Sequence, residues 1–356
     1  MTVLIIAEAG VNHNGDKSKA LSLIDVAAEA GVDAVKFQTF NAERLAAVSA
    51  PKAVYQKQTT DASESQLAML KSLELPVVWH EELQAHAKSL GIEFISTAFD
   101  LGSLAFLESL HLPFYKVPSG EITNGPLLLA FAHTGKNIIL STGMATLGEI
   151  EQALAILAWG YRYQKIPDSL TDVWKHWSCS KASEAIAGKV SLLHCTSQYP
   201  TPMNEVNLKA MDTLSQSFRL PVGYSDHTQG VLVPVAAVAR GAKIIEKHFT
   251  LDRNSPGPDH RASLEPAELS QMVREIRLVE TALGDGRKRP QASEWDTRLA
   301  ARQQLIALSD IHLGETFTPE NLGTARAGLG LLPNHIWDLY GEKTTREYSL
   351  GDPIER

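Results

Sequence analysis

The chain has 356 residues, of which 44% are hydrophobic and 21% charged, and a net charge of −8. This length suits about two domains, or one large barrel with an appendage. The excess of acidic side chains argues against a dedicated nucleic-acid binder, which needs a basic face. It is compatible with an anionic substrate, because a few well-placed lysine or arginine side chains can hold one.

Other features are typical of a cytoplasmic protein. The start, MTVLIIAEAG, has no basic leader, and its apolar run is too short for a signal peptide. No segment approaches the length of a membrane span, so we expect no membrane partner. Cys179 and Cys195 allow at most one disulfide, and we expect both to be free thiols in a reducing compartment.

Eight short apolar runs alternate with longer helical patterns. The expected strands are 3–9, 34–39, 93–99, 114–119, 137–142, 190–196, 220–225 and 242–249. The helix expected at 18–31 starts with a capping serine and ends in glycine, and the one at 265–283 carries a single apolar stripe. Eight such units are typical of a (β/α)8 barrel. The alternative, a doubly wound open sheet, usually has a glycine-rich fingerprint after its first strand, and GVNHNG does not match it.

Two insertions and a different C-terminal region complete the predicted organisation. The insertions are 41–78 and 159–189, and the second holds three tryptophans, a cluster more typical of packing than of binding. We expect the barrel over 1–283, a polar linker over 284–297 and a small β-rich domain over 298–356. A core of that size is marginal, so this domain is expected to lean on the barrel or on a second subunit. WHEELQAH at 79–86 is not HExxH and predicts only a solvated helix start.

Polar residues follow or end each predicted strand, at the face where barrels carry their chemistry. Taken singly, a serine or threonine there is usually a turn residue, and a lone histidine is usually a satisfied one. Two lysines inside strands, Lys36 and Lys116, are harder to explain, because burying an ammonium group is costly without an anion to meet it. With several hydroxyls, they suit a phosphate and a carboxylate.

Histidines and carboxylates on the same face suggest catalysis. His227 and His248 belong to neighbouring strand ends and suit a borderline divalent metal with open positions for water and substrate. Glu8 and Glu121 could serve as acid or base, and Asp259 could bind sugar hydroxyls. Glu246 either supports a residue that holds the metal or forms a salt bridge toward a helix. Lys247 alternates to the other face of its strand and is expected to be structural.

Several motifs together resemble the bacterial sialic acid synthase family, which includes N-acetylneuraminate and N,N'-diacetyllegionaminate synthases. They are IIAEAGVNHNGD, AVKFQTF, YKVPSGEITN, LLHCTSQYPTP, VGYSDHT and IIEKHFTLDRNSPGPDHRASLEP. The resemblance covers essentially the whole chain, and the C-terminal stretch is similar to the family's antifreeze-like (SAF, β-clip) domain. It implies a TIM barrel followed by that domain.

The resemblance also implies the chemistry. The family joins phosphoenolpyruvate to the open-chain aldehyde of an N-acetylated amino sugar and releases phosphate. It implies Mn²⁺ or Mg²⁺ held by His227 and His248, and Glu8 near the reacting centre. The residues implied to hold phosphoenolpyruvate are Lys36, Thr97, Lys116, Ser119, Ser141 and Ser225, with Ser197 where some members have an asparagine that touches it. Those implied to contact the sugar are Glu121, Tyr199 and Asp259. Arg326 matches an arginine that reaches the partner's active site in a domain-swapped homodimer, although Ala327 replaces the usual proline after it.

Alternatives stay open at this point. Glu8 is the first candidate for the base that activates water, and Glu121 the second. The sugar is N-acetylmannosamine or 2,4-diacetamido-2,4,6-trideoxymannose. A synthase for a phosphorylated aldose would need a further basic cluster, which the strand ends lack. A non-catalytic carbohydrate-binding protein would not need the two lysines and two histidines together.

Overall fold

The computed structural model describes residues 2–53, 56–57, 60–61 and 63–355, and part of the 41–78 insertion therefore lies outside the described residues. The chain divides into two units, Met1–Gly284 and Asp285–Arg356. No helix in the described part of the chain is both long enough and apolar enough to cross a membrane.

The first unit is built around eight parallel strands. They are β1 (Leu4–Gly10), β2 (Ala34–Thr39), β3 (Glu93–Ala98), β4 (Phe114–Val117), β5 (Asn137–Ser141), β6 (Val190–His194), β7 (Val222–Asp226) and β8 (Ile244–His248). Their order is β3-β2-β1-β8-β7-β6-β5-β4, and β3 and β4 at its two ends contact each other. The predicted (β/α)8 barrel is confirmed, and every predicted strand is present with ends shifted by a few residues.

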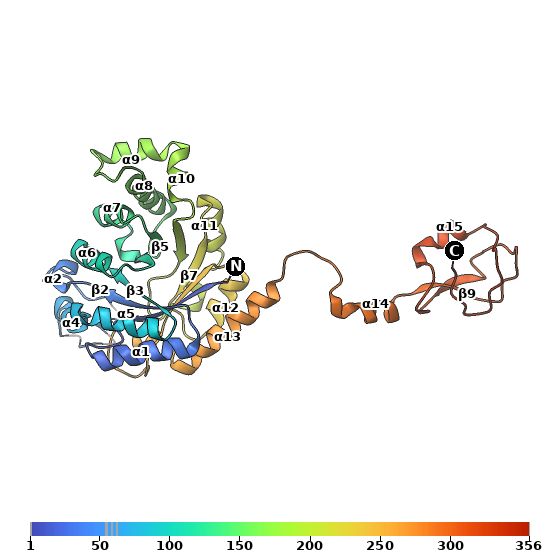
Figure 1. Cartoon of the computed structure of the whole chain (residues 1–356), viewed down its shortest axis with the longest axis horizontal. Helices are drawn as coiled ribbons and strands as arrows, with labels where there is room; N and C mark the ends of the chain where they lie inside the picture. Colours follow the sequence, from blue (N-terminus) through green and yellow to red (C-terminus); the bar gives the residue numbers. More distant parts are fainter. Residues whose placement is uncertain (1, 54–55, 58–59, 62, 356) are drawn as a thin grey trace. The chain divides into compact units, whose positions relative to one another are not determined.

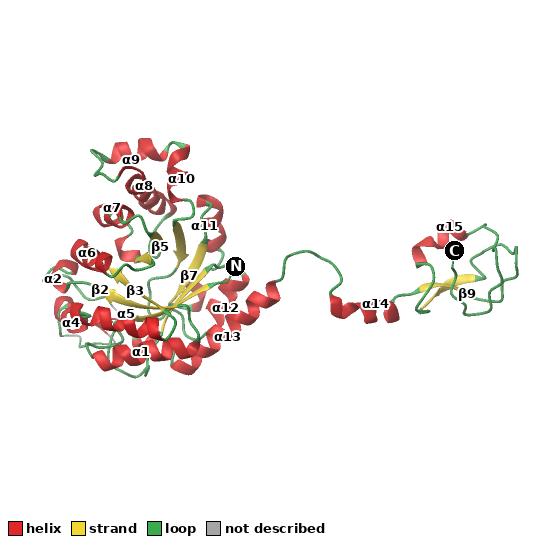
Figure 2. Cartoon of the chain, in the orientation of Figure 1, coloured by secondary structure: helices red, strands yellow, loops and turns green. Residues whose placement is uncertain are grey.

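Helices surround these strands in Figures 1 and 2. The helices are α1 (Lys17–Ala30), α2 (Ala42–Leu45), α4 (Gln66–Leu73), α5 (His80–Ser89), α6 (Leu101–Ser109), α7 (Gly125–His133), α8 (Leu147–Tyr163), α9 (Leu170–Trp177), α10 (Ser180–Ile186), α11 (Ala210–Phe218), α12 (Leu232–Ala239) and α13 (Pro266–Leu283). The expected serine cap of α1 is wrong: the Asp16 carboxylate accepts the backbone N–H groups of Ser18 and Lys19. Asp is as good an N-cap as Ser, and here it comes two residues earlier. Gly31 ends the helix in the left-handed conformation, at φ 78°, which glycine adopts without steric cost.

The second insertion forms α9 and α10, which pack against α8. Trp159 is buried, and Trp174 and Trp177 pack at the edge of the same core, so the expectation of a packing cluster is confirmed.

The expectation that residues 79–86 form a solvated helix start is wrong in one respect. His80, the first residue of α5, is fully buried, and its Nε2 lies 2.8 Å from Thr39 Oγ1. The imidazole fills a space between β2 and α6, where Phe106 packs edge-on against it.

The barrel interior is layered along the strands. An apolar plug fills its lower part and consists of Ile6, Ala34, Ile95, Ile139, Leu193 and Ile244. Because side chains alternate with period two, the residue two positions after each plug residue points inward one layer higher. Those residues are Glu8, Lys36, Thr97, Ser141, Cys195 and Glu246. We call this second set the polar layer. The strand geometry therefore places one side chain from each of these six strands above a dry floor.

Gly223 on β7 allows β7 and β8 to approach each other closely in the barrel interior. A Cβ at Gly223 would lie 2.3 Å from the backbone oxygen of Ile244 on β8 and 2.8 Å from the Ile244 Cβ. Any side chain there would push β7 away from β8. Ser225, two residues further along β7, thereby reaches the polar layer.

The second unit contains η5 (Ala292–Glu294), α14 (Trp295–Ala301), β9 (Gln304–Ala307), β10 (Leu322–Ala325), η6 (Pro333–His335) and α15 (Ile336–Leu339). The two strands pair antiparallel, and isolated bridges join other segments, such as Ile311 to Tyr348. Its own core includes Leu305, Phe317 and Ile354. α14 begins inside the stretch expected to be linker, because Trp295 and the residues after it continue as a helix. Arg326 follows β10 and is exposed in this unit.

Candidate active site

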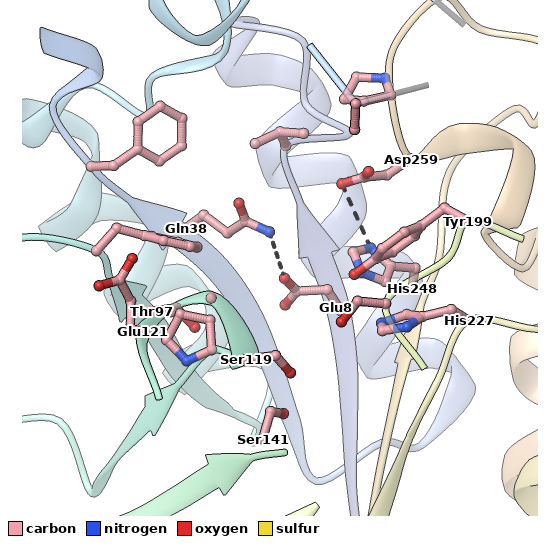
Figure 3. A pocket seen from close by; sticks show the side chains of 18 of the residues that line it. Glu8, Gln38, Thr97, Ser119, Glu121, Ser141, Tyr199, His227, His248 and Asp259 are labelled. Atoms are coloured by element: carbon pink, nitrogen blue, oxygen red, sulfur yellow. Dashed lines mark hydrogen bonds and ion pairs between the residues drawn. The ribbon is translucent and has the colours of Figure 1, made fainter. Parts of the chain in front are cut away.

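A cavity of about 470 Å³ opens above the polar layer at the carboxyl ends of the strands. All thirteen site residues expected in the barrel line it: Glu8, Lys36, Thr97, Lys116, Ser119, Glu121, Ser141, Ser197, Tyr199, Ser225, His227, His248 and Asp259. Figure 3 shows Glu8 near the middle, with Tyr199, His227, His248 and Asp259 to one side. The structure thus brings together residues spread over most of the barrel sequence. Their individual roles stay predictions.

Two buried lysines and two buried carboxylates form the floor of this cavity. Lys36 Nζ lies 2.8 Å from Glu8 Oε2, 3.6 Å from Glu246 Oε2 and 3.1 Å from Thr97 Oγ1. Lys116 Nζ lies 3.3 Å from Glu246 Oε1, which also accepts a hydrogen bond of 2.9 Å from Ser225. The pairing registers explain the cluster, because Glu8 is directly opposite Lys36 on β2 and opposite His248 on β8.

Glu246 is the carboxylate that the two lysines share. Burial alone would raise its pKa, but the charges of Lys116 and Lys36 outweigh burial and lower the pKa to about 2. Burial raises the pKa of Glu8, and the neighbouring Glu246 charge adds to that effect against the opposing charge of Lys36. The two carboxyl groups therefore differ: Glu246 gives up its proton more readily than an ordinary glutamate, while Glu8 takes one up more readily.

Hydroxyl groups surround the two ammonium groups. Ser119 Oγ accepts the backbone N–H of Gly143 at 3.0 Å and lies 3.2 Å from the thiol of Cys195. Ser141 Oγ is buried and has no hydrogen-bond partner in the described part of the chain. A buried hydroxyl without a partner is costly, and an oxygen-rich ligand would satisfy it. This set of donors fits a phosphate or carboxylate group.

The two histidines fit a divalent cation. His227 Nδ1 lies 2.7 Å from the backbone oxygen of Thr196, so Nδ1 carries the proton and the lone pair is left on Nε2. The ring of His248 lies 5.6 Å from that of His227, and its buried Nδ1 makes no hydrogen bond in the described part of the chain. Burial lowers the pKa of both imidazoles, which keeps them neutral as metal binding requires.

The protein itself offers only part of a coordination shell. Among the described residues, no group of three or more His, Cys, Asp or Glu side chains is arranged to hold a metal ion. Two neutral imidazoles would leave most positions of a cation to water and substrate, which is the arrangement of a catalytic site. The residues present therefore fit the divalent metal that the resemblance implies.

Aromatic and acidic groups line the histidine side of the cavity. The ring of Tyr199 packs on His227 at 4.1 Å and meets His248 edge-on at 5.7 Å. Asp259 Oδ2 lies 4.0 Å from His248 Nδ1, and burial raises the pKa of Asp259 to about 7. Glu121 accepts a hydrogen bond from Asn124 at 2.6 Å. These side chains present hydrogen-bonding groups and a flat apolar face, as sugar sites do.

The structure corrects some expectations and adds residues. Glu246 does not face a helix, because its carboxylate lies in the barrel interior between the two lysines, and its charge also acts on His248. Those lysines therefore meet carboxylates of the chain itself, so their burial alone does not demand an external anion. The inward alternation from His248 back to Glu246 could have revealed this. Lys247 faces outward, as expected, and pairs with Asp226 at 2.5 Å.

Gln38 and Cys195 also line the cavity, although neither was expected to act there. Gln38 donates a hydrogen bond of 3.0 Å to Glu8 Oε1 (Figure 3). Its place two residues after Lys36 on one face of β2 was the available signal. Cys195 is a buried free thiol whose pKa is raised by burial. Arg326 belongs to the second unit, outside this set.

Comparison with known proteins decides the family. The NeuB family model matches residues 23–288, most of the barrel. The chain belongs to the NeuB family. The sequence of this NeuB-family chain is similar to those of two N,N'-diacetyllegionaminic acid synthases. The one from Campylobacter jejuni is 48% identical over 351 residues, covering 99% of this chain and 98% of its own. The one from Legionella pneumophila is 45% identical, covering 99% and 94%.

A solved NeuB-like structure agrees with the fold. The N-acetylneuraminic acid (sialic acid) synthetase of Leptospira borgpetersenii is 34% identical, with a TM-score of 0.66, and the match covers 84% of this chain and 90% of that one. The expected membership in the sialic acid synthase family is confirmed, as is the expectation of an enzyme of that synthase type.

Proposed function

We propose that this enzyme condenses phosphoenolpyruvate with 2,4-diacetamido-2,4,6-trideoxymannose, giving N,N'-diacetyllegionaminate and phosphate. The observation that carries the proposal is a cavity with two buried ammonium groups and the unsatisfied Ser141 hydroxyl at its floor and two neutral imidazoles on one side. The names of the relatives at 48% and 45% identity favour the doubly acetylated sugar over N-acetylmannosamine.

Lys36 and Lys116 are the groups that bind phosphoenolpyruvate in this proposal. Thr97, Ser119 and Ser141 surround them, and the Gly143 N–H orients the Ser119 hydroxyl. Ser225 is held by Glu246, and Ser197 lines the same cavity. Two positive charges fixed before the ligand arrives stabilise a transferring or departing phosphate without reorganisation.

The aldehyde of the open-chain sugar belongs on the histidine side. His227 and His248 would hold Mn²⁺ or Mg²⁺. Bound there, the cation would polarise the aldehyde oxygen and make its carbon a better electrophile. Glu121, Tyr199 and Asp259 are positioned to orient the sugar. The carbon 2–carbon 3 π pair of phosphoenolpyruvate then forms the bond to the aldehyde carbon, which leaves positive charge at carbon 2. The C=O π pair moves to the aldehyde oxygen, which takes up a proton and becomes a hydroxyl group.

Glu8 is the base that we assign to the next step. Water adds at carbon 2 and loses a proton to Glu8, whose pKa is raised by burial and which therefore takes up a proton more readily than an ordinary glutamate. Gln38 holds the carboxylate through Oε1, which fixes its direction. Collapse of the tetrahedral intermediate breaks the carbon–oxygen bond to phosphate, and the two lysines stabilise the leaving charge. Glu121 is the second candidate for the base.

We also propose a domain-swapped homodimer in which Arg326 completes the partner's cavity. This proposal rests on the family resemblance and on the small core of the second unit. We propose in addition that the enzyme acts in the cytoplasm, as expected from the sequence.

The lining of the cavity disfavours the phosphorylated-aldose alternative. Among the described residues that line it, Lys36 and Lys116 are the only lysine or arginine side chains, and both lie at the floor. A second phosphate at the far end of a sugar would need further cations.

The test is phosphate release from phosphoenolpyruvate with Mn²⁺, using the two sugars in parallel. We expect release that depends on sugar and metal, is faster with the diacetamido sugar, and is lost in His248→Ala. His86→Ala, a half-exposed histidine on α5, is the matched control and should retain activity. No release by folded, metal-supplied protein with either sugar would return the non-catalytic carbohydrate-binding alternative to first place.

A further inference from the structure

One side of the cavity is apolar. Beyond the polar layer, β2 and β3 each continue with an aromatic residue: Phe40 comes two positions after Gln38, and Phe99 two after Thr97. The 41–78 insertion adds side chains from α2 and α4 to the same cavity. We define the apolar wall as Phe40, Leu45, Met69, Leu70, Leu73 and Phe99.

The wall is packed without a ligand. Phe40, Met69 and Leu73 are buried in one cluster, and Leu45, Leu70 and Phe99 pack against it. The rings of Phe40 and Phe99 meet edge-to-face at 5.9 Å and 87°. An ion pair of 2.6 Å between Lys71 and Glu43 joins α4 to α2 on the exposed side. An apolar surface fixed in this way discriminates between ligands without rearranging.

The strand order sets the wall apart from the imidazoles. β1 carries Glu8 and has β2 and β3 on one side and β8 and β7 on the other. Phe40 and Phe99 follow β2 and β3, whereas His248 and His227 belong to β8 and the end of β7. A sugar whose aldehyde lies by the histidines above Glu8 therefore extends its other end toward the apolar wall.

We propose that the apolar wall binds the C6 end of the sugar and selects a 6-deoxy, doubly acylated substrate. The inference rests on the function proposed above. A C6 methyl group and acetamido methyls lose water favourably against Leu45, Leu70 and the two phenylalanines. A hydroxymethyl group in the same place loses its hydrogen bonds to water and finds no polar partner within the wall.

The amide side chain of Gln66 stands beside this surface. Gln66 lines the cavity one helical turn before Leu70 on α4, so the two side chains share a face. Its side-chain amide is suited to a hydrogen bond with the 4-acetamido group. The neighbouring Leu67 on the same helix is not among the lining residues and supplies a matched control.

The experiment measures kcat/KM for both sugars in the Mn²⁺-loaded full-length enzyme and in three variants of similar side-chain size. We expect the wild type to prefer the 6-deoxy diacetamido sugar by roughly 100-fold, the discrimination that an apolar pocket gives against an added hydroxyl. Leu70→Gln and Leu45→Gln should each reduce this preference by about 3- to 10-fold, through the KM of the sugar, with the KM of phosphoenolpyruvate unchanged. Leu67→Gln should keep the wild-type preference.

The outcomes separate the two proposals. Turnover with an unchanged preference in both cavity variants, shown by circular dichroism to be folded, overturns the apolar wall alone. An equal effect of Leu67→Gln does the same, whereas a wild type that prefers N-acetylmannosamine overturns both the apolar wall and the sugar proposed above. Absence of turnover with either sugar in the wild type counts against the synthase proposal itself.

Discussion

Glu246 shows how a single side chain prepares the floor of the cavity. It contacts Lys36 and Lys116 and accepts from Ser225, all in the barrel interior. Without it, two ammonium groups would face each other in a region of low dielectric, where like charges repel strongly. Burial lowers the pKa of Lys116 and the Glu246 charge opposes that effect, while the pKa of Lys36 is raised because the charges of Glu246 and Glu8 outweigh burial.

Replacing Glu246 with glutamine should expose this role. Glu246→Gln keeps the shape but removes the anion, and breaking a buried ion network costs about 3 kcal/mol or more. We expect a lower Tm, and a larger increase in Tm on adding inorganic phosphate than the wild type shows, because the anion supplies the missing charge. The exposed Glu184→Gln on α10 is the control. Equal phosphate shifts in variant and wild type would contradict this role.

Two buried histidines outside the cavity should make stability depend on pH. Burial lowers the pKa of His13 and of His260 to about 4. Because each is neutral when folded but protonates near pH 6.5 when unfolded, its contribution is present above pH 6.5 and is lost as pH falls toward 4. The loss is at most about 3 kcal/mol per histidine. Asp259, with its raised pKa, acts in the opposite direction over part of this range.

The measurement is therefore a difference. Urea unfolding of the wild type and of His260→Gln at pH 7 and pH 5 gives the effect of the substitution at each pH. We expect the destabilisation caused by His260→Gln to shrink at pH 5, since the wild type loses stability there through His260 and the variant does not. His13→Gln should behave in the same way. A difference that stays constant with pH would show that these imidazoles are not held neutral by the fold.

At the scale of elements, the contact between β7 and β8 depends on Gly223. The Ile244 side chain of the apolar plug and its backbone oxygen occupy the space where a side chain on Gly223 would lie. Since β7 carries Ser225 and leads to His227, and β8 carries Glu246 and His248, the separation of these two strands sets the geometry of half the site.

Gly223→Ala tests that dependence. The added methyl group must displace backbone, so we expect destabilisation of about 1–3 kcal/mol and a larger relative loss of metal-dependent phosphate release. Gly148→Ala is the matched control, since a Cβ there would have only Thr146 Oγ1 at 4.0 Å and the position lies in the first turn of α8. Thermal unfolding and the phosphate assay measure both effects. Full activity with an unchanged Tm in Gly223→Ala would refute the close-approach argument.

The sequence predicted the elements better than it predicted their partners. Alternation and β-branched runs located all eight strands, because each pattern is local. The barrel then implied that polar strand ends converge, and they do. What the lysines contact depends on the registers of β1, β2 and β8, which no local pattern contains. The burial of His80 was missed for the same reason, since Thr39 and Phe106 are distant in sequence.

At the scale of the whole molecule, the second unit has a small core. Its buried side chains include Leu305, Ile311 and Tyr348, while Leu313, Trp337 and Leu350 are exposed. A core of this size is marginal by itself, and exposed large apolar groups favour burial against another surface. These features support the proposed exchange of this unit between two subunits.

Mixing two inactive variants tests the exchange. The Arg326→Ala variant has an intact barrel site but lacks the proposed arginine. The His248→Ala variant keeps the arginine but has a defective barrel site. If Arg326 acts on the partner, a mixed dimer contains one complete site, and statistical mixing restores about a quarter of wild-type activity. We would unfold and refold the variants together and assay phosphate release. If the arginine acts within its own chain, the mixture stays as inactive as its components.

The layering of the barrel separates residues whose positions tolerate little change in sequence from residues whose positions tolerate much more. The lysines and their carboxylates stand on strands, directly above the apolar plug, where one inserted residue would turn the side chains of a strand inside out. The apolar wall stands largely on a segment inserted between β2 and β3, where length and composition can drift without disturbing any strand. Substitutions in that segment can therefore change which sugar such a barrel accepts, while the residues of the bond-forming step stay the same.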